Sequence, residues 1–218
     1  MPAMPAEHFT HVDGWVFDLD NTLYPPETRL FDQIETRMTT YVMNALGIDH
    51  DAANRLRHDY WVTYGTTLAG LMARHDINPT EYMVAVHDID FSVISPDPEL
   101  RIQIKTLPGR KIVYTNGSAE YAQRVISARG LDGLFDAVYG VEDAGYLPKP
   151  EAEAFARVFS RDGLDTARAA MFEDDARNLA APHAMGMRTV HVAPAPVTAP
   201  HIHHHTDDLG RFLALLQN

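Results

Sequence analysis

Two aspartates stand at the end of a short apolar segment near the beginning of the chain. Residues 14–17 read Gly-Trp-Val-Phe and are followed by Asp18, Leu19 and Asp20. Such a segment predicts a buried strand, and open parallel sheets bind their ligands at the carboxyl edge. Because side chains alternate along a strand, Asp18 and Asp20 are expected on the same face. Neighbouring carboxylates repel each other unless a cation or a shared proton compensates them, which indicates a divalent metal ion.

Polar groups also follow later apolar segments. In chain order they are Thr115 and Asn116, Lys149, and Glu173 and Asp174. Taken singly, each has an ordinary explanation: a turn residue, a surface charge, or an acidic cap for the helix that follows. A parallel sheet, however, would gather carboxylates, a hydroxyl and an ammonium group at one edge. That combination is improbable by chance and favours a catalytic site.

These groups are suited to phosphoryl transfer through an aspartyl-phosphate. A carboxylate can attack phosphorus in line once the phosphoryl oxygens are neutralised, and Asp18 is the predicted nucleophile. Lys149 and Thr115 are predicted to hold the phosphoryl oxygens. The N–H groups of the turn at Asn116 and Gly117 are expected to assist them.

A magnesium ion and a general acid–base complete the predicted chemistry. Mg²⁺ binds a few carboxylates together with water and substrate oxygens. Its predicted ligands are Asp18 and Asp174, with Glu173 acting through water. Asp20 lies two residues beyond the nucleophile on the same face. It is therefore predicted to protonate the leaving alkoxide and then to deprotonate the water that hydrolyses the intermediate.

The remaining patterns predict an α/β fold with a doubly wound, Rossmann-like parallel sheet, because strands alternate with amphipathic helices. Strands are predicted at 111–117 (running into a turn), 137–141, 169–172 and 189–193, and helices at 119–129, 151–161, 177–185 and from Leu209. In the helix 151–161, Ala152, Phe155, Ala156 and Phe159 form the predicted inner stripe. The histidine-rich residues 201–205 are expected to form a solvated loop.

The segment between the first two strands breaks this alternation. Residues 27–94 carry only helical patterns and are too long for a simple crossover. They predict an all-helical cap at 25–96, inserted into a catalytic core made of 1–24 and 97–218. The candidates for stacking on a substrate ring are Tyr24, Trp61 and Tyr64, and those for hydrogen bonding are Thr66, Thr67 and His87. For Trp61 and Tyr64, however, a place in the interior of the cap itself is the favoured interpretation.

Composition excludes several classes of protein. A net charge of −12 and a pI near 5.3 argue against nucleic-acid polymers and anionic membranes as partners. The absence of cysteine excludes disulfides and thiolate chemistry. No segment has the length of a membrane span, and the first eight residues lack the pattern of a signal peptide. A cytoplasmic protein, monomeric or weakly dimeric, is therefore expected.

Four segments resemble the motifs of haloacid-dehalogenase-superfamily phosphatases. They are Asp-Leu-Asp-Asn-Thr-Leu-Tyr at 18–24, Thr-Asn-Gly at 115–117, Lys-Pro at 149–150 and Phe-Glu-Asp-Asp-Ala-Arg-Asn at 172–178. The resemblance implies a helical cap inserted after the first strand, Asp18 as nucleophile and Asp174 as a direct metal ligand. It also implies that Asp20 binds the metal through its backbone carbonyl. Many relatives carry an aspartate where this chain has Asn178. Dehalogenases generally lack an acid at the position of Asp20.

Further phrases are similar to those of pyrimidine 5′-nucleotidases. They include Tyr-Gly-Thr-Thr-Leu-Ala-Gly-Leu at 64–71 and Glu-Asp-Ala-Gly-Tyr-Leu-Pro-Lys-Pro at 142–150. The resemblance implies a Mg²⁺-dependent phosphatase whose substrate is a small nucleotide such as a pyrimidine nucleoside 5′-monophosphate. Two other activities stay open: a phosphatase for sugar phosphates or phosphoglycolate, and a receiver-type signalling module phosphorylated on aspartate. A scaffold without activity ranks last, because every required group is present.

Overall fold

The computed structural model describes residues 5–217, which form a six-stranded sheet in which all strands are parallel. The strand order β3-β2-β1-β4-β5-β6 places the first strand in the middle. The strands are β1 (Gly14–Phe17), β2 (Arg110–Tyr114), β3 (Ala137–Tyr139), β4 (Ala169–Glu173), β5 (Arg188–Val192) and β6 (His204–Thr206). The predicted Rossmann-like α/β fold class is confirmed.

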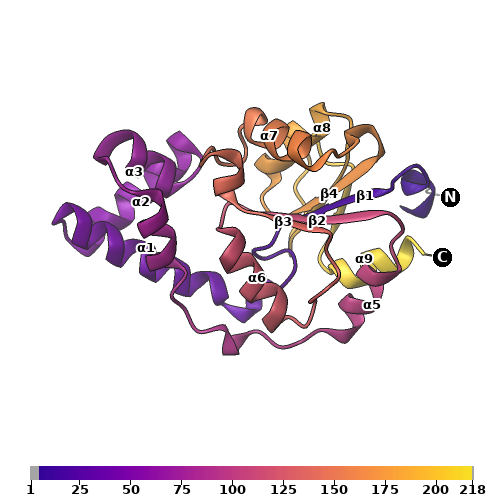
Figure 1. The fold of residues 1–218 in the computed structure, drawn as a ribbon, viewed down its shortest axis with the longest axis horizontal. Helices are drawn as coiled ribbons and strands as arrows, with labels where there is room; N and C mark the ends of the chain where they lie inside the picture. Colours follow the sequence, from indigo (N-terminus) through magenta and orange to yellow (C-terminus); the bar gives the residue numbers. More distant parts are fainter. Residues whose placement is uncertain (1–4, 218) are drawn as a thin grey trace.

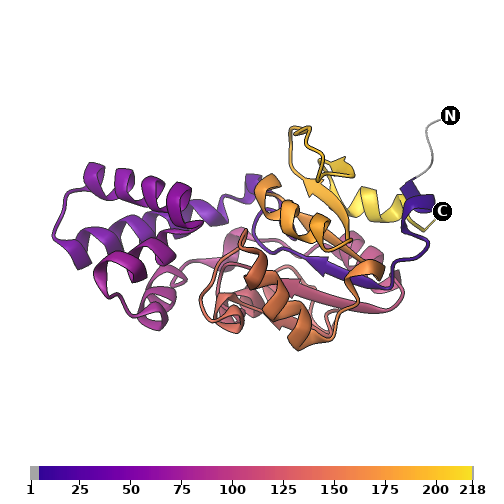
Figure 2. The same ribbon diagram turned by 90° about the horizontal axis from the view of Figure 1, so that it is seen from above.

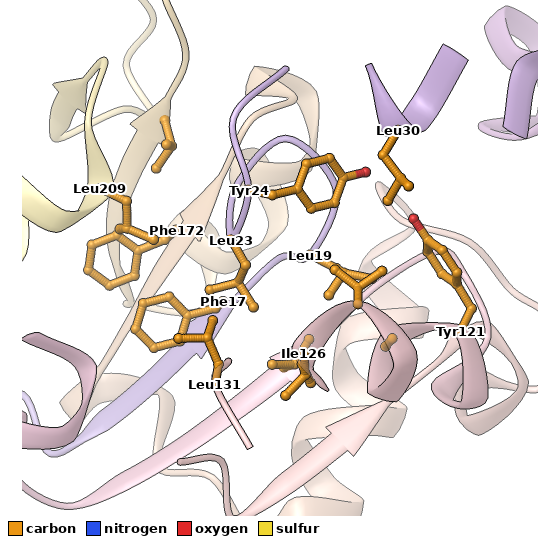
Figure 3. Packing of buried hydrophobic residues seen from close by; sticks show 14 of the residues in the cluster. Phe17, Leu19, Leu23, Tyr24, Leu30, Tyr121, Ile126, Leu131, Phe172 and Leu209 are labelled. Carbon is orange, nitrogen blue, oxygen red and sulfur yellow. The ribbon is translucent and has the colours of Figure 1, made fainter. Parts of the chain in front are cut away.

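Helices cover both faces of the sheet (Figure 1). One face carries α5 (Pro98–Thr106), α6 (Ala119–Ala128) and α9 (Leu209–Leu215), and the other carries α7 (Ala152–Asp162) and α8 (Ala180–Ala184). Alternation along β1 supplies both hydrophobic cores. Phe17 stacks on Phe172 of β4 at 4.9 Å between ring centroids on the first face (Figure 3), whereas Val16 packs with Phe155 of α7 on the second.

Four of the five α-helices between β1 and β2 in the chain form a separate layer beside the sheet (Figures 1 and 2). They are α1 (Leu30–Leu46), α2 (His50–Tyr64), α3 (Thr67–His75) and α4 (Pro79–Val86). The side chains of Asp49, Thr66 and Asn78 cap the first turns of α2, α3 and α4 by accepting backbone N–H bonds. The helical content predicted for this segment is present. The domain limits at 25 and 96 stay a prediction.

Short 3₁₀ helices connect these elements. They are η1 (Pro5–Phe9), η2 (Pro26–Thr28), η3 (Phe91–Val93), η4 (Val141–Ala144), η5 (Thr166–Arg168) and η6 (Ala176–Leu179). Two of them replace predicted elements. The third strand ends at Tyr139 and gives way to η4, and the helix expected at 177–185 divides into η6 and α8. Pro182, which has no backbone N–H, lies inside the short α8.

Two sequence predictions about packing are wrong. In α7 the buried face consists of Ala154, Phe155, Val158 and Phe159, whereas Ala152 and Ala156 are exposed. The small alanines do not discriminate between adjacent helix faces, and the larger Val158 decides the orientation. His204 and His205, expected in a loop, belong to β6 at the sheet edge beside β5.

The histidines around β6 have structural hydrogen bonds. His205 Nε2 donates to the carbonyl of Ala193, and His201 Nε2 donates to the carbonyl of Ala176. Within residues 5–217 the one group of three or more possible metal ligands lies elsewhere and contains no histidine. None of the helices in this described part of the chain is both long and apolar enough to cross a bilayer.

Candidate active site

The carboxyl ends of three adjacent strands place the predicted site residues together. Phe17, the last residue of β1, is in register with Val113 of β2 and Phe172 of β4. The residues that follow these positions therefore leave the sheet side by side. They include Asp18, Thr115, Glu173 and Asp174, which all line one cavity together with Lys149.

Lys149 forms the electrostatic centre of this edge. Its Nζ donates to Asp18 Oδ1 and to Glu173 Oε2, both at 2.6 Å, and to the carbonyl of Tyr114 at 3.2 Å. All three charged side chains are buried, with 4% of Asp18 and 1% of Lys149 and Glu173 exposed. Burial by itself lowers the pKa of Lys149, but the carboxylates of Asp18 and Glu173 outweigh it and raise that pKa. Lys149 is therefore a fixed cation.

One ammonium group does not balance the carboxylates around it. Ligand atoms of Asp18, Glu173 and Asp174 all lie within 4.8 Å of one another. Burial and the neighbouring Glu173 raise the pKa of Asp18 well above its ordinary value, although Lys149 lowers it. Burial and the charges of Glu173 and Asp18 likewise raise the pKa of Asp174. The cluster therefore carries more negative charge than the residues around it compensate.

The donor set of this cluster fits a hard divalent cation such as Mg²⁺, which prefers carboxylate and amide oxygens. Asn178 Oδ1 is buried and has no hydrogen-bond partner among the described residues, so a further acceptor is available there. Glu173 Oε1 already accepts from Asn178 Nδ2 and from the N–H of Asp175, and its Oε2 accepts from Lys149. Glu173 is thus better placed to act through water than directly, and its role at a metal ion stays a prediction.

The loop after β1 is fastened to the same cluster. Asn21 has a φ of 56°, a left-handed conformation that asparagine tolerates better than most residues. Its Nδ2 donates to Asp174 Oδ2 at 3.3 Å. On the other side, Nε2 of the buried His191 donates to the backbone carbonyl of Asp174 at 2.9 Å. Asp174 is therefore held from two sides.

Asp20 is held by two tyrosine hydroxyl groups. Tyr24 and Tyr121 each donate to Asp20 Oδ1 at 2.6 Å. Burial raises the pKa of Asp20, while the hydrogen bonds from both tyrosines lower it. Burial and the charge of Asp20 raise the pKa of each tyrosine well above its ordinary value, so both hydroxyls remain protonated donors.

The turn after β2 contributes a hydroxyl and an amide. Thr115 is fully buried, and its Oγ1 accepts the N–H of Gly117 at 2.9 Å. That N–H, expected to hold a phosphoryl oxygen, is therefore engaged by Thr115. No described residue accepts a hydrogen bond from the N–H of Asn116. The Asn116 side chain donates to the carbonyl and accepts from the N–H of Lys149, so it fixes the lysine's backbone.

The site opens into a cavity of about 860 Å³ between the sheet edge and helices α1, α2 and α4. Thr66, Thr67 and His87, expected to bond substrate, all line it. Gly65, with a φ of 85°, lets the turn after α2 approach the core, because an added Cβ would lie 3.3 Å from the carbonyl of Lys149. The helical layer thus lies directly over Lys149 and the carboxylates around it.

The three aromatic residues predicted as candidates for stacking on a substrate ring lie in different surroundings. The prediction that Tyr24 stacks on a substrate ring is wrong, because its own ring is 1% exposed and does not line the cavity. Tyr64 packs edge-on against Tyr60 and also lies outside the cavity lining. Trp61 is 43% exposed, lines the cavity and stacks on the guanidinium of Arg177 at 3.8 Å. It is therefore not part of the cap interior.

Some residues that line the cavity were not predicted from the sequence. Arg57 and Tyr82 line the cap side of the cavity, where the Nε of Arg57 and the hydroxyl of Tyr82 are buried. A signal for Arg57 existed, since Asn54, Arg57 and Trp61 recur at helical spacing on one face of α2. Tyr121 is 101 residues from Asp20, so no local pattern could have joined them.

Comparison of the sequence with known proteins identifies the family of this chain. The sequence profile of the haloacid dehalogenase-like hydrolases matches residues 12–186. Phosphate metabolism protein 8 of Saccharomyces cerevisiae is 26% identical over an alignment of 189 residues, which covers 78% of this chain and 58% of the yeast protein. The chain thus spans less than two thirds of that relative.

Solved structures resemble the chain in fold. CbbY from Rhodobacter sphaeroides in complex with phosphate has a TM-score of 0.66 at 17% identity, with 95% of this chain and 100% of CbbY covered. YfnB from Bacillus subtilis, solved with bound magnesium, has a TM-score of 0.56 at 16% identity, with 95% and 99% covered. The profile match covers most of the chain, and the fold and site agree with it. The chain belongs to the haloacid dehalogenase-like hydrolases.

Proposed function

We propose that this hydrolase is a Mg²⁺-dependent phosphatase that releases phosphate from small phosphomonoesters, above all pyrimidine nucleoside 5′-monophosphates. The observation that supports it most is the buried Asp18, whose Oδ1 is fixed by Lys149 while its Oδ2 accepts no hydrogen bond from a described residue. A carboxylate held by one oxygen and free at the other is arranged for attack on phosphorus.

The proposed reaction has two steps. Asp18 attacks phosphorus as the bond to the ester oxygen breaks, and Asp20 gives its proton to that leaving oxygen. Asp20 then takes a proton from water, which attacks the aspartyl-phosphate, breaks its P–O bond and releases phosphate. Lys149 and the Thr115 hydroxyl hold phosphoryl oxygens. Mg²⁺, held by Asp18 and Asp174 with Asn178 nearby, would neutralise charge on the phosphoryl group.

The cap side of the cavity supports a substrate with a flat or apolar leaving group. Its apolar lining residues include Phe31, Ile34, Met38, Met83 and Val86. A phosphate on a very small molecule such as glycolate would leave this wall unused. A nucleoside base would cover it.

Two unpaired polar groups in the same wall support recognition of acceptors on that leaving group. Arg57 Nη1 donates to the Thr39 hydroxyl at 2.6 Å and to Asn54 Oδ1 at 3.2 Å, and its Nη2 is paired with Glu35 Oε1 at 3.3 Å. Its Nε is buried without a partner among the described residues. The hydroxyl of Tyr82 is also buried without a partner. A pyrimidine carbonyl presents an acceptor that suits the Nε–H of Arg57 or the hydroxyl of Tyr82.

The second candidate is a phosphatase for sugar phosphates or phosphoglycolate. Arg57 is the observation that favours it, because a guanidinium also binds a carboxylate or a second phosphate. A receiver-type module is disfavoured by the large cavity, since such a module needs no room for a leaving group.

Phosphate release with added Mg²⁺ separates these activities. The substrates are UMP, CMP, phosphoglycolate and a sugar phosphate, with EDTA and the Asp18→Asn variant as controls. The proposal expects the highest kcat/KM with the pyrimidine nucleotides. A tenfold or greater preference for the sugar phosphate or phosphoglycolate would contradict the nucleotidase assignment. A phosphorylated protein that persists for minutes without turnover would contradict phosphatase activity.

A further inference from the structure

Two tyrosines from distant parts of the chain converge on one oxygen of Asp20. Tyr24 lies six residues beyond Asp18 in the loop after β1, and Tyr121 lies in the first turn of α6. Each hydroxyl donates to Asp20 Oδ1 at 2.6 Å, and each ring is 1% exposed. Figure 3 shows the two hydroxyls pointing toward one another from opposite segments. Both rings are enclosed by protein and are not free to stack on a substrate.

This arrangement treats the two carboxylate oxygens of Asp20 differently. Oδ1 accepts two short hydrogen bonds, which use both of its lone pairs. No residue in the described part of the chain bonds Oδ2, and Asp20 lines the cavity. The carboxyl group therefore cannot rotate without breaking two hydrogen bonds. Its Oδ2 is the atom left for exchange of a proton.

The packing around Tyr121 keeps its ring in place. The imidazole of His87, at the end of α4 in the helical layer, stacks on the ring at 4.1 Å with 7° between the planes. His87 Nδ1 lies 3.2 Å from the hydroxyl of Ser118, which caps α6. A Cβ at Gly117 would approach Tyr121 Cδ1 to 2.8 Å, so glycine leaves the space that the ring occupies. The ring is thus fixed from both the core and the cap.

We infer that Tyr24 and Tyr121 are positioning residues that confine the proton transfers of Asp20 to its Oδ2. The inference rests on the proposed function, in which Asp20 is the general acid and base. The tyrosines transfer no proton themselves. The proton moves from Oδ2 to the leaving oxygen in the first step and from water to Oδ2 in the second, so Asp20 ends as it began.

The test uses Tyr24→Phe, Tyr121→Phe and the double variant. These changes remove the hydroxyls and keep the rings. Tyr60→Phe is the matched control, because Tyr60 also makes a 2.6 Å hydrogen bond, to His75, but lies outside the cavity lining. Asp20→Asn tests the acid–base role itself. Thermal unfolding of every variant establishes that it is folded at the assay temperature.

Two kinds of leaving group distinguish positioning from a structural role. An alkyl ester such as UMP needs a proton from Asp20 to leave, whereas p-nitrophenyl phosphate releases a stable phenolate without one. With UMP each tyrosine variant should lower kcat by about 10- to 100-fold while KM changes by less than about twofold. The pre-steady-state rate of p-nitrophenol release should change by less than about threefold, because that step does not need the acid.

The outcomes distinguish a failure of the acid–base role of Asp20 from a failure of the positioning role of the two tyrosines. If Asp20→Asn leaves UMP hydrolysis intact, the proposed acid–base role fails and the inference fails with it. If Asp20→Asn removes activity while both tyrosine variants match Tyr60→Phe, only the inference is overturned. Equal losses with the alkyl and aryl esters would also overturn it, because they would show a general disturbance of the site.

Discussion

The two ends of the Asp18–Lys149 ion pair should contribute to stability with opposite signs. Lys149 is paired with both Asp18 and Glu173, so its removal leaves two buried carboxylates without a cation. Among residues 5–217, Asp18 has only this lysine as a side-chain partner, and it suffers repulsion from Glu173. Its removal leaves Lys149 still paired with Glu173 at 2.6 Å. Loss of the Lys149 side chain should therefore lower the free energy of unfolding, whereas loss of the Asp18 charge should not.

The magnitudes follow from burial. Breaking a buried pair so that a charge is left alone costs about 3–5 kcal/mol, and Lys149→Met should destabilise the protein by that amount. For a chain of this size the corresponding fall in Tm is about 6–20 °C. Asp18→Asn replaces a carboxylate, whose buried charge is disfavoured, by a neutral group of the same shape. Its Tm should equal or exceed that of the wild type.

Calorimetric or denaturant unfolding in EDTA measures both effects without a contribution from metal. Both variants are expected to lack phosphatase activity, so activity alone does not distinguish them. The reasoning is refuted if Asp18→Asn lowers Tm as much as Lys149→Met does. It is also refuted if Lys149→Met leaves Tm unchanged, because the lysine would then not be balancing the cluster.

Three further results are expected. Mg²⁺ at about one hundred times its Kd should stabilise the protein by about 2.7 kcal/mol and raise Tm by about 5–11 °C. Asp174→Asn should remove that thermal shift, and an equal shift in this variant would place the ion elsewhere. Burial and Arg124 lower the pKa of His87 to about 3, below its ordinary 6.5, so the imidazole is neutral in the folded protein. Its contribution to stability is complete above pH 6.5 and falls with pH, by about 2 kcal/mol between pH 7 and pH 5. Unfolding at both pH values should show this loss in the wild type relative to His87→Gln, and parallel behaviour of the two proteins would contradict it. Arg57→Met should raise KM for UMP by about 10- to 100-fold with a much smaller effect on kcat, because a hydrogen bond to a charged group is lost. Arg55→Met on the exposed side of α2 is its control, and equal KM values for the two variants would exclude Arg57 from substrate recognition.

The sheet edge could be predicted because local sequence determines it. An apolar strand that ends in charged residues places those residues at the edge, whatever surrounds it, and Asp18, Thr115 and Glu173 follow this rule. Lys149 was found by its motif. Its contact with Asp18 across 131 residues is a property of the folded chain.

The cap side resisted prediction because its roles depend on packing. Tyr24 follows the first motif and looks like a substrate contact, but its ring turns into the core and its hydroxyl reaches Asp20. Trp61 is a large aromatic residue of the kind usually found in a core, yet its ring stacks on Arg177 of η6, outside the cap. β6 has three residues, two of them histidine, and owes its strand conformation to pairing with β5.

The stack of Trp61 on Arg177 gives the molecule an internal optical reporter. The chain has two tryptophans, and the other, Trp15, is sealed in the core with its indole N–H bonded to the carbonyl of Pro108. A shift of α2 relative to η6 alters the surroundings of one indole and leaves the other constant. The emission of Trp15 thus provides a constant baseline. A change in fluorescence on ligand binding then reports a movement of the helical layer relative to the sheet, through Trp61 alone.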